Sequence, residues 1–276
     1  MTSSPTDSIV EVSVTIAASL ETVWSYFTDD AKFAAWIGSF TGMGSLPGTR
    51  VEARVGGSLR IEYPDMTGQS PVGSVAIGRI EALTPMSLAV FTWGYEKDQM
   101  HTGLAPGSSR VEVHLREQPD GVRVTLKHAG IASPQVREGH RVGWIHYLAM
   151  LARDSAQSQH ATSAPVIYAD YERAWSEPND PARRALLARA CEPDIQVRTG
   201  FACTNTLEAL DQHIAGALKH MPGFTLAHQA PPKVSHNFAH VSWVVQAPNG
   251  QPAFSGVNVL EFSPRGLIRR LVSFPG

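Results

Sequence analysis

The chain has 276 residues, 43% of them hydrophobic and 17% charged, and its formal net charge at pH 7 is −2. This composition is typical of globular proteins and excludes a disordered chain. The near-neutral charge without a basic cluster argues against a nucleic-acid-binding protein, and no apolar run approaches the roughly 18 residues of a membrane span. A chain of this length predicts two domains.

Two further features predict a reducing, cytoplasmic location. Residues 1–8 show no basic start followed by an apolar run, so they are not expected to be a secretory signal. With no export route, Cys191 and Cys203 are expected to be free thiols that act as small core side chains.

The first domain is predicted to begin with a strand and two short helices. Residues 9–16 alternate apolar and polar side chains, Ser19 suits the N-cap of a helix through Phe27, and a second helix covers 31–36. Six further strands are expected, with Asp120-Gly121 as a hairpin turn between the last two. Their predicted ranges are 50–55, 58–63, 72–83, 86–95, 109–116 and 121–128.

A long helix is expected to close this domain, with Ser133 as its N-cap and Pro134 as its first residue. Its apolar stripe is predicted to face the sheet. That stripe has one row at Val142, Ile145, Ala149 and Ala152 and a second at Trp144, Leu148 and Leu151.

The run 154–163 is small, polar and free of large apolar side chains. We place a linker at 156–163, with the preceding helix free to extend into it. The predicted domains are therefore residues 1–155 and 164–276.

In the second domain the helices precede the strands. Helices are expected at 165–175, at 180–190 and from the Thr206 cap to His220, with a short strand at 195–198. Asn249-Gly250 and Pro264–Gly266 are predicted turns between the later strands, whose ranges are 224–230, 233–246, 253–262 and 266–274. Helices that lead into a strongly bent antiparallel sheet form a cone with an open end.

Several segments of the first domain carry a family resemblance: residues 14–24, 33–36, 54–60, 90–93 and Gly143-Trp144 in the long helix. They resemble the SRPBCC superfamily, with its helix-grip, START-like fold, and within it the branch named after the activator of the heat-shock-protein-90 ATPase. The resemblance implies a helix-grip fold over about residues 9–153. It implies little about function, because that branch mixes binders, cyclases and uncharacterised proteins.

The second domain carries another resemblance, in residues 168–175, 180–187, 254–262 and 266–274. These resemble the SnoaL-like branch of the nuclear-transport-factor-two-like superfamily, which includes polyketide cyclases and ketosteroid isomerase-like enzymes. The fold class is therefore predicted to be α+β, a helix-grip domain followed by a cone-shaped barrel. The resemblance implies a pocket for a small apolar or aromatic molecule, and cofactor-free cyclisation, dehydration or isomerisation.

At two positions where such relatives often carry an aspartate, this chain has Thr199-Gly200 and Asn258. Both departures remove a carboxylate that could act as a base, whereas Thr199 and Asn258 can still orient a ligand by hydrogen bonds. His228 or His236 could act as the base in its place. The alternative is that these histidines are structural or face solvent.

Other residues are candidates for ligand binding in the second domain: Tyr171, Trp175, Arg198, Thr199 and Trp243. Arg198 is equally well interpreted as a surface residue. Trp243, together with Val241 and Val245, could face either the pocket or an outer sheet surface that forms a homodimer.

The first domain offers Tyr63, Trp93, His128 and Trp144 as ligand-binding candidates, because apolar walls with a few polar groups are typical of small-molecule sites. The same side chains could simply form a core. No metal site is expected, since His140 and His146 point about 120° apart on a helix, and no cofactor is expected.

The leading hypothesis is a protein that binds a small apolar or aromatic molecule, with His228, His236 and Asn258 as catalytic candidates if it is a polyketide-type cyclase, dehydratase or isomerase. One alternative is a non-catalytic carrier or sensor. A second is a chaperone-associated or regulatory module, suggested only by the first family's name.

Overall fold

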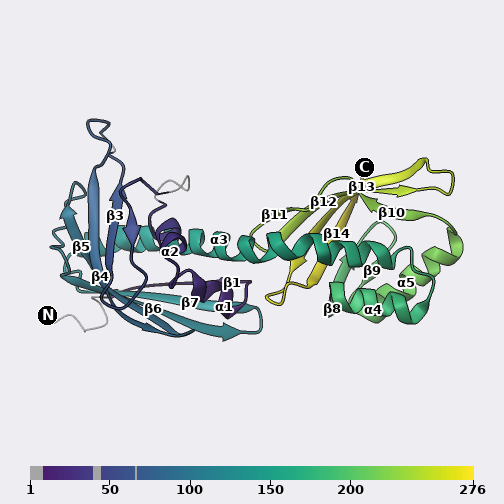
Figure 1. The fold of residues 1–276 in the computed structure, drawn as a ribbon, viewed down its shortest axis with the longest axis horizontal. Coiled ribbons are helices and arrows are strands. Elements are labelled where there is room, and N and C mark those ends of the chain that lie inside the picture. Colours follow the sequence, from purple (N-terminus) through teal and green to yellow (C-terminus); the bar gives the residue numbers. More distant parts are fainter. Residues whose placement is uncertain (1–8, 40–44, 66) are drawn as a thin grey trace. The chain divides into compact units, whose positions relative to one another are not determined.

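The computed structural model of the protein describes residues 9–39, 45–65 and 67–276, so the expectation for residues 1–8 lies outside the described residues. The chain forms two compact units that meet between Ser155 and Ala156. Each unit has one seven-stranded sheet packed with helices, which confirms the predicted α+β fold class (Figure 1).

The N-terminal sheet is entirely antiparallel, in the order β1-β7-β6-β5-β4-β3-β2. Its strands are β1 (Val10–Ile16), β2 (Arg50–Val51), β3 (Ser58–Tyr63), β4 (Ser74–Thr84), β5 (Leu88–Lys97), β6 (Ser109–Gln118) and β7 (Gly121–Ala129). The strand expected at 50–55 stops at Val51, because the backbone turns where Gly57 N–H bonds the Arg54 carbonyl and Gly56 adopts a φ of 81°.

Two short helices follow β1, as predicted. Helix α1 (Leu20–Ser25) begins at the expected cap, where Thr22 N–H donates to Ser19 Oγ over 3.1 Å. Helix α2 (Asp30–Ile37) is capped in the same way by the side chain of Asp29.

Helix α3 runs without a break from Pro134 to Ala174, so the predicted loop at 156–163 is wrong. That stretch contains no glycine or proline, and the hydroxyls of Thr162 and Ser163 bond carbonyls four residues back in the helix. Pro165 lies within the helix at the cost of one backbone N–H. Although α3 is long, no helix among the described residues is apolar enough to cross a membrane.

The side of α3 that is buried in the N-terminal unit differs in part from the prediction. Val142 and Ile145 are 56% and 49% exposed, so their predicted place against the sheet is wrong. The buried stripe is Trp144, Tyr147, Leu148 and Leu151, at spacings of three and four. Its large aromatic side chains pack against aromatic residues of the sheet, with the rings of Trp144 and Trp93 only 5.2 Å apart.

A chain of hydrogen bonds crosses this aromatic core. Trp144 Nε1 donates to His128 Nδ1 over 3.0 Å, so the proton of the neutral imidazole is on Nε2, which bonds Ser109 Oγ over 2.8 Å. Ser109 Oγ in turn donates to the Trp93 carbonyl. These bonds join α3 to β5, β6 and β7.

A second imidazole lies beside this chain, since the rings of His128 and His140 are 5.2 Å apart. His140 Nδ1 donates to the Val136 carbonyl and its Nε2 is 3.3 Å from the Tyr95 hydroxyl. Burial, and secondarily the neighbouring His140, lowers the pKa of His128 to about 3. Burial also lowers the pKa of His140, although Asp98 and the Val136 carbonyl oppose that shift.

The C-terminal unit consists of the last turns of α3, two further helices and the second sheet, in the order β10-β12-β13-β14-β8-β9 with β11 paired to β12. The helices are α4 (Asp180–Ala190) and α5 (Leu207–His220). The strands are β8 (Cys191–Arg198), β9 (Cys203–Thr204), β10 (Thr225–His228), β11 (Lys233–Ser235), β12 (Phe238–Gln246), β13 (Pro252–Phe262) and β14 (Ile268–Pro275). Thr206 caps α5 as predicted, with Ala209 N–H bonded to its hydroxyl.

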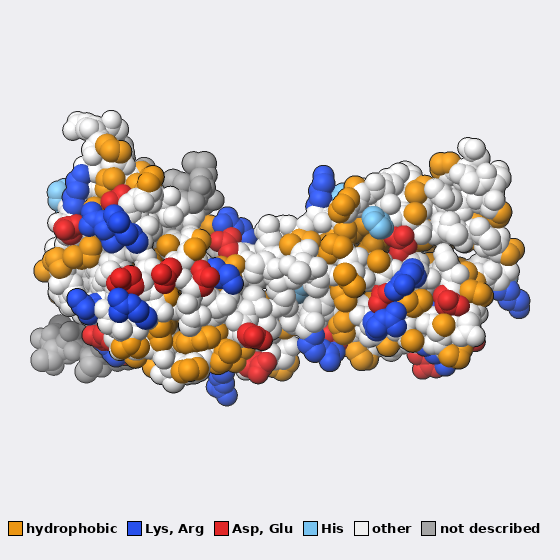
Figure 2. All heavy atoms as spheres, in the orientation of Figure 1, with side chains coloured by type: hydrophobic (Ala, Val, Ile, Leu, Met, Phe, Trp, Pro, Cys, Tyr) orange, Lys and Arg blue, Asp and Glu red, His pale blue; other side chains and the backbone are white. Residues whose placement is uncertain are grey.

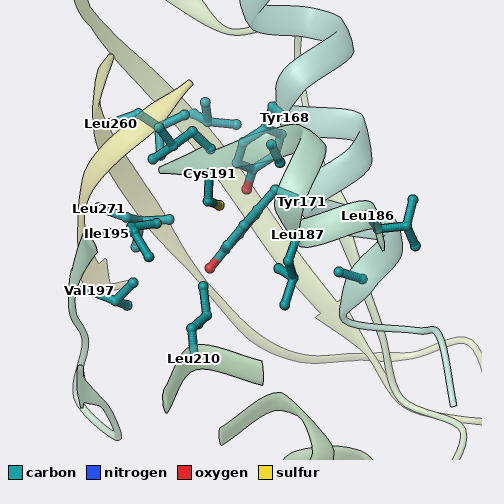
Figure 3. Close-up of a cluster of buried hydrophobic side chains, with 14 of the residues drawn as sticks. Tyr168, Tyr171, Leu186, Leu187, Cys191, Ile195, Val197, Leu210, Leu260 and Leu271 are labelled. Carbon is teal, nitrogen blue, oxygen red and sulfur yellow. The ribbon is translucent and has the colours of Figure 1, made fainter. Parts of the chain in front are cut away.

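The helices bury their apolar faces against one side of this sheet. Tyr168 and Tyr171 extend from α3 into the same cluster as Leu187 of α4, Leu210 of α5 and Leu260 of β13 (Figure 3). Helices on the concave side of a bent sheet produce the predicted cone.

Two expectations for this unit are wrong. The strand expected at 233–246 is a hairpin, with His236 at a φ of 55° in the turn between β11 and β12, a conformation that histidine tolerates better than most residues. Cys191 is a buried free thiol, as expected, but Cys203 is exposed because it lies on the two-residue strand β9 at the sheet edge.

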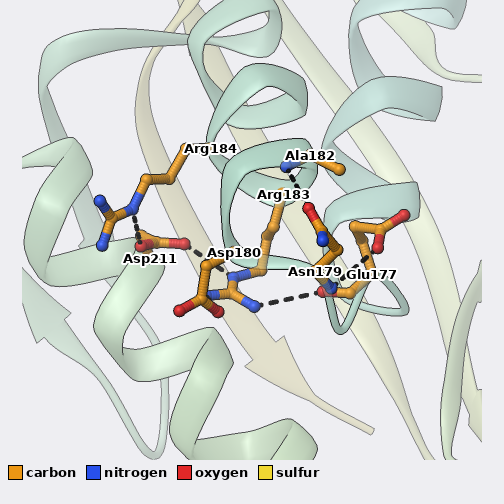
Figure 4. Close-up of polar contacts among 7 residues, drawn as sticks. All are labelled: Glu177, Asn179, Asp180, Ala182, Arg183, Arg184 and Asp211. Carbon is orange, nitrogen blue, oxygen red and sulfur yellow. Dashed lines mark hydrogen bonds and ion pairs between the residues drawn. The ribbon is translucent and has the colours of Figure 1, made fainter.

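A buried ion-pair network joins α4 to α5. Arg183 is 2% exposed and Asp211 3% exposed, and Arg183 Nε lies 2.7 Å from Asp211 Oδ1. The other Asp211 oxygen bonds Arg184, and Arg183 also reaches Asp180 (Figure 4). Arg183 and Arg184 lower the pKa of Asp211 against the opposing effect of burial.

We expect acid to destabilise the N-terminal unit through its buried histidines. Their folded-state pKa values lie below the unfolded value of 6.5, so this contribution to stability is complete above about pH 6.5 and is lost as the pH falls towards 3. Urea unfolding of His128→Gln at several pH values should show a slope smaller by up to about 1.4 kcal/mol per pH unit. The exposed His114→Gln serves as control, and an unchanged slope in His128→Gln would refute the assignment.

Removing the acidic partner of Arg183 should cost far more than removing an exposed acid on the same helix. Asp211→Ala leaves a buried guanidinium without its main partner, and we expect a loss of about 3–5 kcal/mol in the free energy of unfolding. Glu208→Ala, at an exposed position of α5, should change it by less than about 0.5 kcal/mol. Equal losses in urea denaturation would contradict this interpretation.

Candidate functional site

A groove of about 620 Å³ opens between the C-terminal end of α3, helix α4 and the edge strand β10. Its lining residues are Glu172, Arg173, Ser176, Glu177, Ala182, Ala185, Leu186, Arg189 and Leu226. The volume is in the range of small-molecule sites. On the face drawn in Figure 2, the surface of this unit shows the same mixture of apolar and charged side chains of both signs.

One rim of the groove is held by a shared carboxylate. Asp170 is buried and pairs with both Arg173 and Arg189, with Arg189 Nε 2.8 Å from Asp170 Oδ2. These bonds, led by that from Arg189, lower the pKa of Asp170. Both arginines line the groove and are fixed by Asp170, although their side chains are largely exposed.

Glu172 connects the groove to a histidine. Its Oε2 accepts two hydrogen bonds from His228, one from the backbone N–H over 3.0 Å and one from Nδ1 over 2.6 Å. A carboxylate only accepts, so Nδ1 carries the proton and Nε2 of the neutral imidazole is left as an acceptor. This is the arrangement by which a carboxylate orients a histidine for proton transfer.

Asn258 lies deeper in the cone and bonds the same helix. Its Nδ2 donates to the Tyr168 hydroxyl over 3.1 Å, and both residues are buried. Burial raises the pKa of Tyr168, more than the bond from Asn258 lowers it. The Tyr168 ring meets that of His228 edge to face at 6.1 Å, so Asn258, Tyr168 and His228 are contiguous.

Three predicted aromatic residues lie on the same side of the sheet. Tyr171 is buried in the core and contacts Trp175, whose ring also meets His213 of α5 at 5.8 Å. Trp243 is directly opposite His228 in the β10–β12 pair, so both side chains lie on one face of the sheet, the same face as buried Val241. The indole Nε1 of Trp243 is buried and has no hydrogen-bond partner among the described residues.

The structure does not bring the other three predicted residues of this unit to the site. His236 is exposed in the β11–β12 turn. Arg198 bonds the Thr204 carbonyl and the Asn205 side chain, and Thr199 Oγ1 accepts the N–H groups of residues 201 and 202 in the following turn. Their polar atoms are thus used to hold the connection from β8 to β9.

In the N-terminal unit, the four predicted residues Tyr63, Trp93, His128 and Trp144 are all at most 4% exposed. The last three contact one another through ring packing and the hydrogen bonds described above. This placement matches the alternative that they form a core.

Glu172 and the residues that form the walls of the groove are not among the site residues predicted from the sequence. Glu172 lies 56 residues before His228, and no local pattern indicates that pairing. A usable signal is the helical spacing, since Tyr168, Glu172 and Trp175 are four and three residues apart and therefore share one face of α3.

The fold and the site define a protein of two α+β units, a helix-grip unit and a cone, in which the cone carries an open groove beside a carboxylate-oriented histidine. Residues 17–153 match the family model described as Activator of Hsp90 ATPase homolog 1-like protein. The predicted resemblance of the N-terminal half is confirmed by this match. A comparison with curated proteins found no significant match.

Solved structures similar to part of the chain include two that are described as SnoaL-like or NTF2-like. A member of the SnoaL-like family from Agrobacterium tumefaciens is 24% identical, with a TM-score of 0.39, and the match covers 43% of this chain and 98% of that one. Protein CV1439 from Chromobacterium violaceum is 23% identical, with a TM-score of 0.40 and coverages of 52% and 94%. An NTF2-like protein of unknown function from Exiguobacterium is 13% identical, with a TM-score of 0.34 and coverages of 40% and 98%.

The Asn258–Tyr168 bond can be tested by a double-mutant cycle. Tyr168→Phe leaves a buried amide donor without its partner and should lower the free energy of unfolding by about 1–3 kcal/mol. Adding Asn258→Val removes that donor, so we expect the double variant to lose less than the sum of the single losses. Strictly additive losses in urea denaturation would show that the two side chains are not coupled.

Proposed function

We propose that the C-terminal unit binds a small, mostly apolar or aromatic molecule in the groove between α3, α4 and β10. The observation that supports this most directly is that Glu172 both lines the groove and holds His228. A bound molecule is thus placed beside a polar group with defined hydrogen-bonding direction. Such a combination of apolar walls and a few positioned polar groups is typical of small-molecule sites.

The apolar part of the groove suits a ring or a short aliphatic body. Ala182, Ala185 and Leu186 contribute it from α4 and Leu226 from β10. Burial of apolar surface contributes roughly 25 cal/mol per Å², so these side chains favour the apolar part of a ligand.

Within this proposal, the protein acts on the bound molecule as a cofactor-free cyclase, dehydratase or isomerase of the polyketide type. His228, oriented by Glu172, supplies the base that Thr199 and Asn258 cannot. His236 does not join this pair, because it lies exposed in the turn between β11 and β12, whereas His228 lies opposite Trp243 farther along β12. The alternative of a non-catalytic carrier or sensor uses the same groove, and turnover of bound ligand distinguishes the two.

Two further proposals concern partners. A homodimer through the C-terminal sheet is supported by the partly exposed apolar side chains on its outer face, opposite buried Asn258 and Leu260: Val257, Val259, Val272 and Phe274. A chaperone-associated role is supported only by the description of the family that residues 17–153 match.

Filling the groove should abolish binding. Ala185 lines it and Ala188, one turn of α4 away from that wall, is exposed but does not line it. We expect wild type and Ala188→Trp to show a thermal shift with apolar aromatic ligands, worth about 2.7 kcal/mol at a hundred times the dissociation constant, and Ala185→Trp to show none. The groove would be ruled out as the site if no ligand of the panel raised the melting temperature of wild type and the control. It would also be ruled out if the ligands raised that of Ala185→Trp by the same amount.

A further inference from the structure

The direction of the hydrogen bonds at His228 restricts the chemistry of what can bind beside it. Both donors of this residue, the backbone N–H and Nδ1–H, are directed to the single oxygen Oε2 of Glu172. In the neutral imidazole the second ring nitrogen then has a lone pair and no proton. His228 therefore offers its surroundings an acceptor.

That acceptor is available. No described residue bonds His228 Nε2, and the side chain is 40% exposed. Tyr168 contacts the ring edge to face from the core side, and Trp243 lies across from it on β12. His228 and Leu226 are two residues apart on β10, so their side chains lie on the same face of the strand. Leu226 lines the groove.

We propose that the ligand of this groove is a hydroxylated aromatic molecule whose O–H group donates to His228 Nε2, with Glu172 as the positioning residue that fixes the proton of the neutral imidazole on Nδ1. This inference rests on the proposed function and deepens it by naming the ligand class. A hydroxyl donates to the acceptor directly, whereas an ether or a plain hydrocarbon has no donor and leaves the nitrogen to water. We therefore expect the hydroxylated molecule to bind several-fold more tightly.

The aromatic character of the ligand follows from the rim. Arg173 and Arg189 both line the groove, together with Ala185 and Leu186, and the guanidinium group of each is bonded to Asp170. Guanidinium planes stack on aromatic faces more favourably than on aliphatic chains. A flat ring with a polar hydroxyl at one end matches both features.

The test compares three probes that share one ring system, namely 2-naphthol, 2-methoxynaphthalene and naphthalene. Dissociation constants are measured by ligand fluorescence titration of the full chain at about pH 7.5. We expect wild type to bind 2-naphthol roughly five to tenfold more tightly than 2-methoxynaphthalene, which is the fold-change of one neutral hydrogen bond. The ratio of the two constants is the readout, because a merely structural defect would weaken both probes equally.

Variants of His228 and Glu172 test which side chains produce the preference for 2-naphthol. His228→Phe removes the acceptor and Glu172→Met removes the group that fixes the tautomer, so both should bring the ratio close to one. Glu172→Gln retains a side-chain oxygen that can accept from Nδ1 and should keep most of the preference. The control His240→Phe, at an exposed position on the opposite face of the sheet, should match wild type.

The outcomes separate the inference from the function beneath it. If wild type binds all three probes with equal affinity, or if His228→Phe keeps the preference for 2-naphthol, the inference is wrong and the groove remains a binding site. If none of the probes binds and Ala185→Trp behaves as wild type, the proposed function fails for this ligand class and the inference fails with it.

Discussion

The bond between Glu172 and His228 is the interaction on which the C-terminal site depends. It ties the short edge strand β10 to α3 at both a backbone and a side-chain donor, and both elements contribute residues that line the groove. An edge strand of four residues has few ladder bonds of its own, so its position relies on such a cross-link. The same bond sets which ring nitrogen is free. The carboxylate of Glu172 therefore both holds β10 beside α3 and determines which ring nitrogen of His228 can accept a hydrogen bond.

The two units use their histidines in opposite ways. In the N-terminal unit, His128 accepts from Trp144 and bonds Ser109, so both of its nitrogens are satisfied inside a filled aromatic core. Such a network is favourable only while every member has a partner. In the C-terminal unit, His228 has one nitrogen bound and one available at a groove. Complete pairing indicates a structural role, while an unused acceptor beside an apolar groove is what a ligand site requires.

Much of the architecture was predictable because its signals are local. The Ser19 and Thr206 caps, the hairpin signal at Asp120-Gly121 and the alternation of residues 9–16 each depend on a few neighbouring side chains. The structure has the caps, the strand and the hairpin, although the turn itself is Pro119-Asp120 and Gly121 is the first residue of β7. The site was less predictable, since Glu172 and His228 meet only after the sheet has formed. The continuous helix α3 illustrates another limit. A polar, small-residue stretch predicts a loop by composition, yet without glycine or proline its backbone has no reason to leave the helix.

The polar side chains of Asn258 and Thr199 have structural roles in the C-terminal unit. Asn258 bonds Tyr168 in the core, and Thr199 stabilises a turn, so neither is free to exchange a proton. The titratable group of the proposed site is His228 on the edge strand β10, which is partly solvated and lies on the same strand face as Leu226, a residue that lines the groove. In the proposed complex its second ring nitrogen is accessible to the ligand. Because water also reaches it, selectivity must come from hydrogen-bond direction and ring stacking rather than from exclusion of solvent.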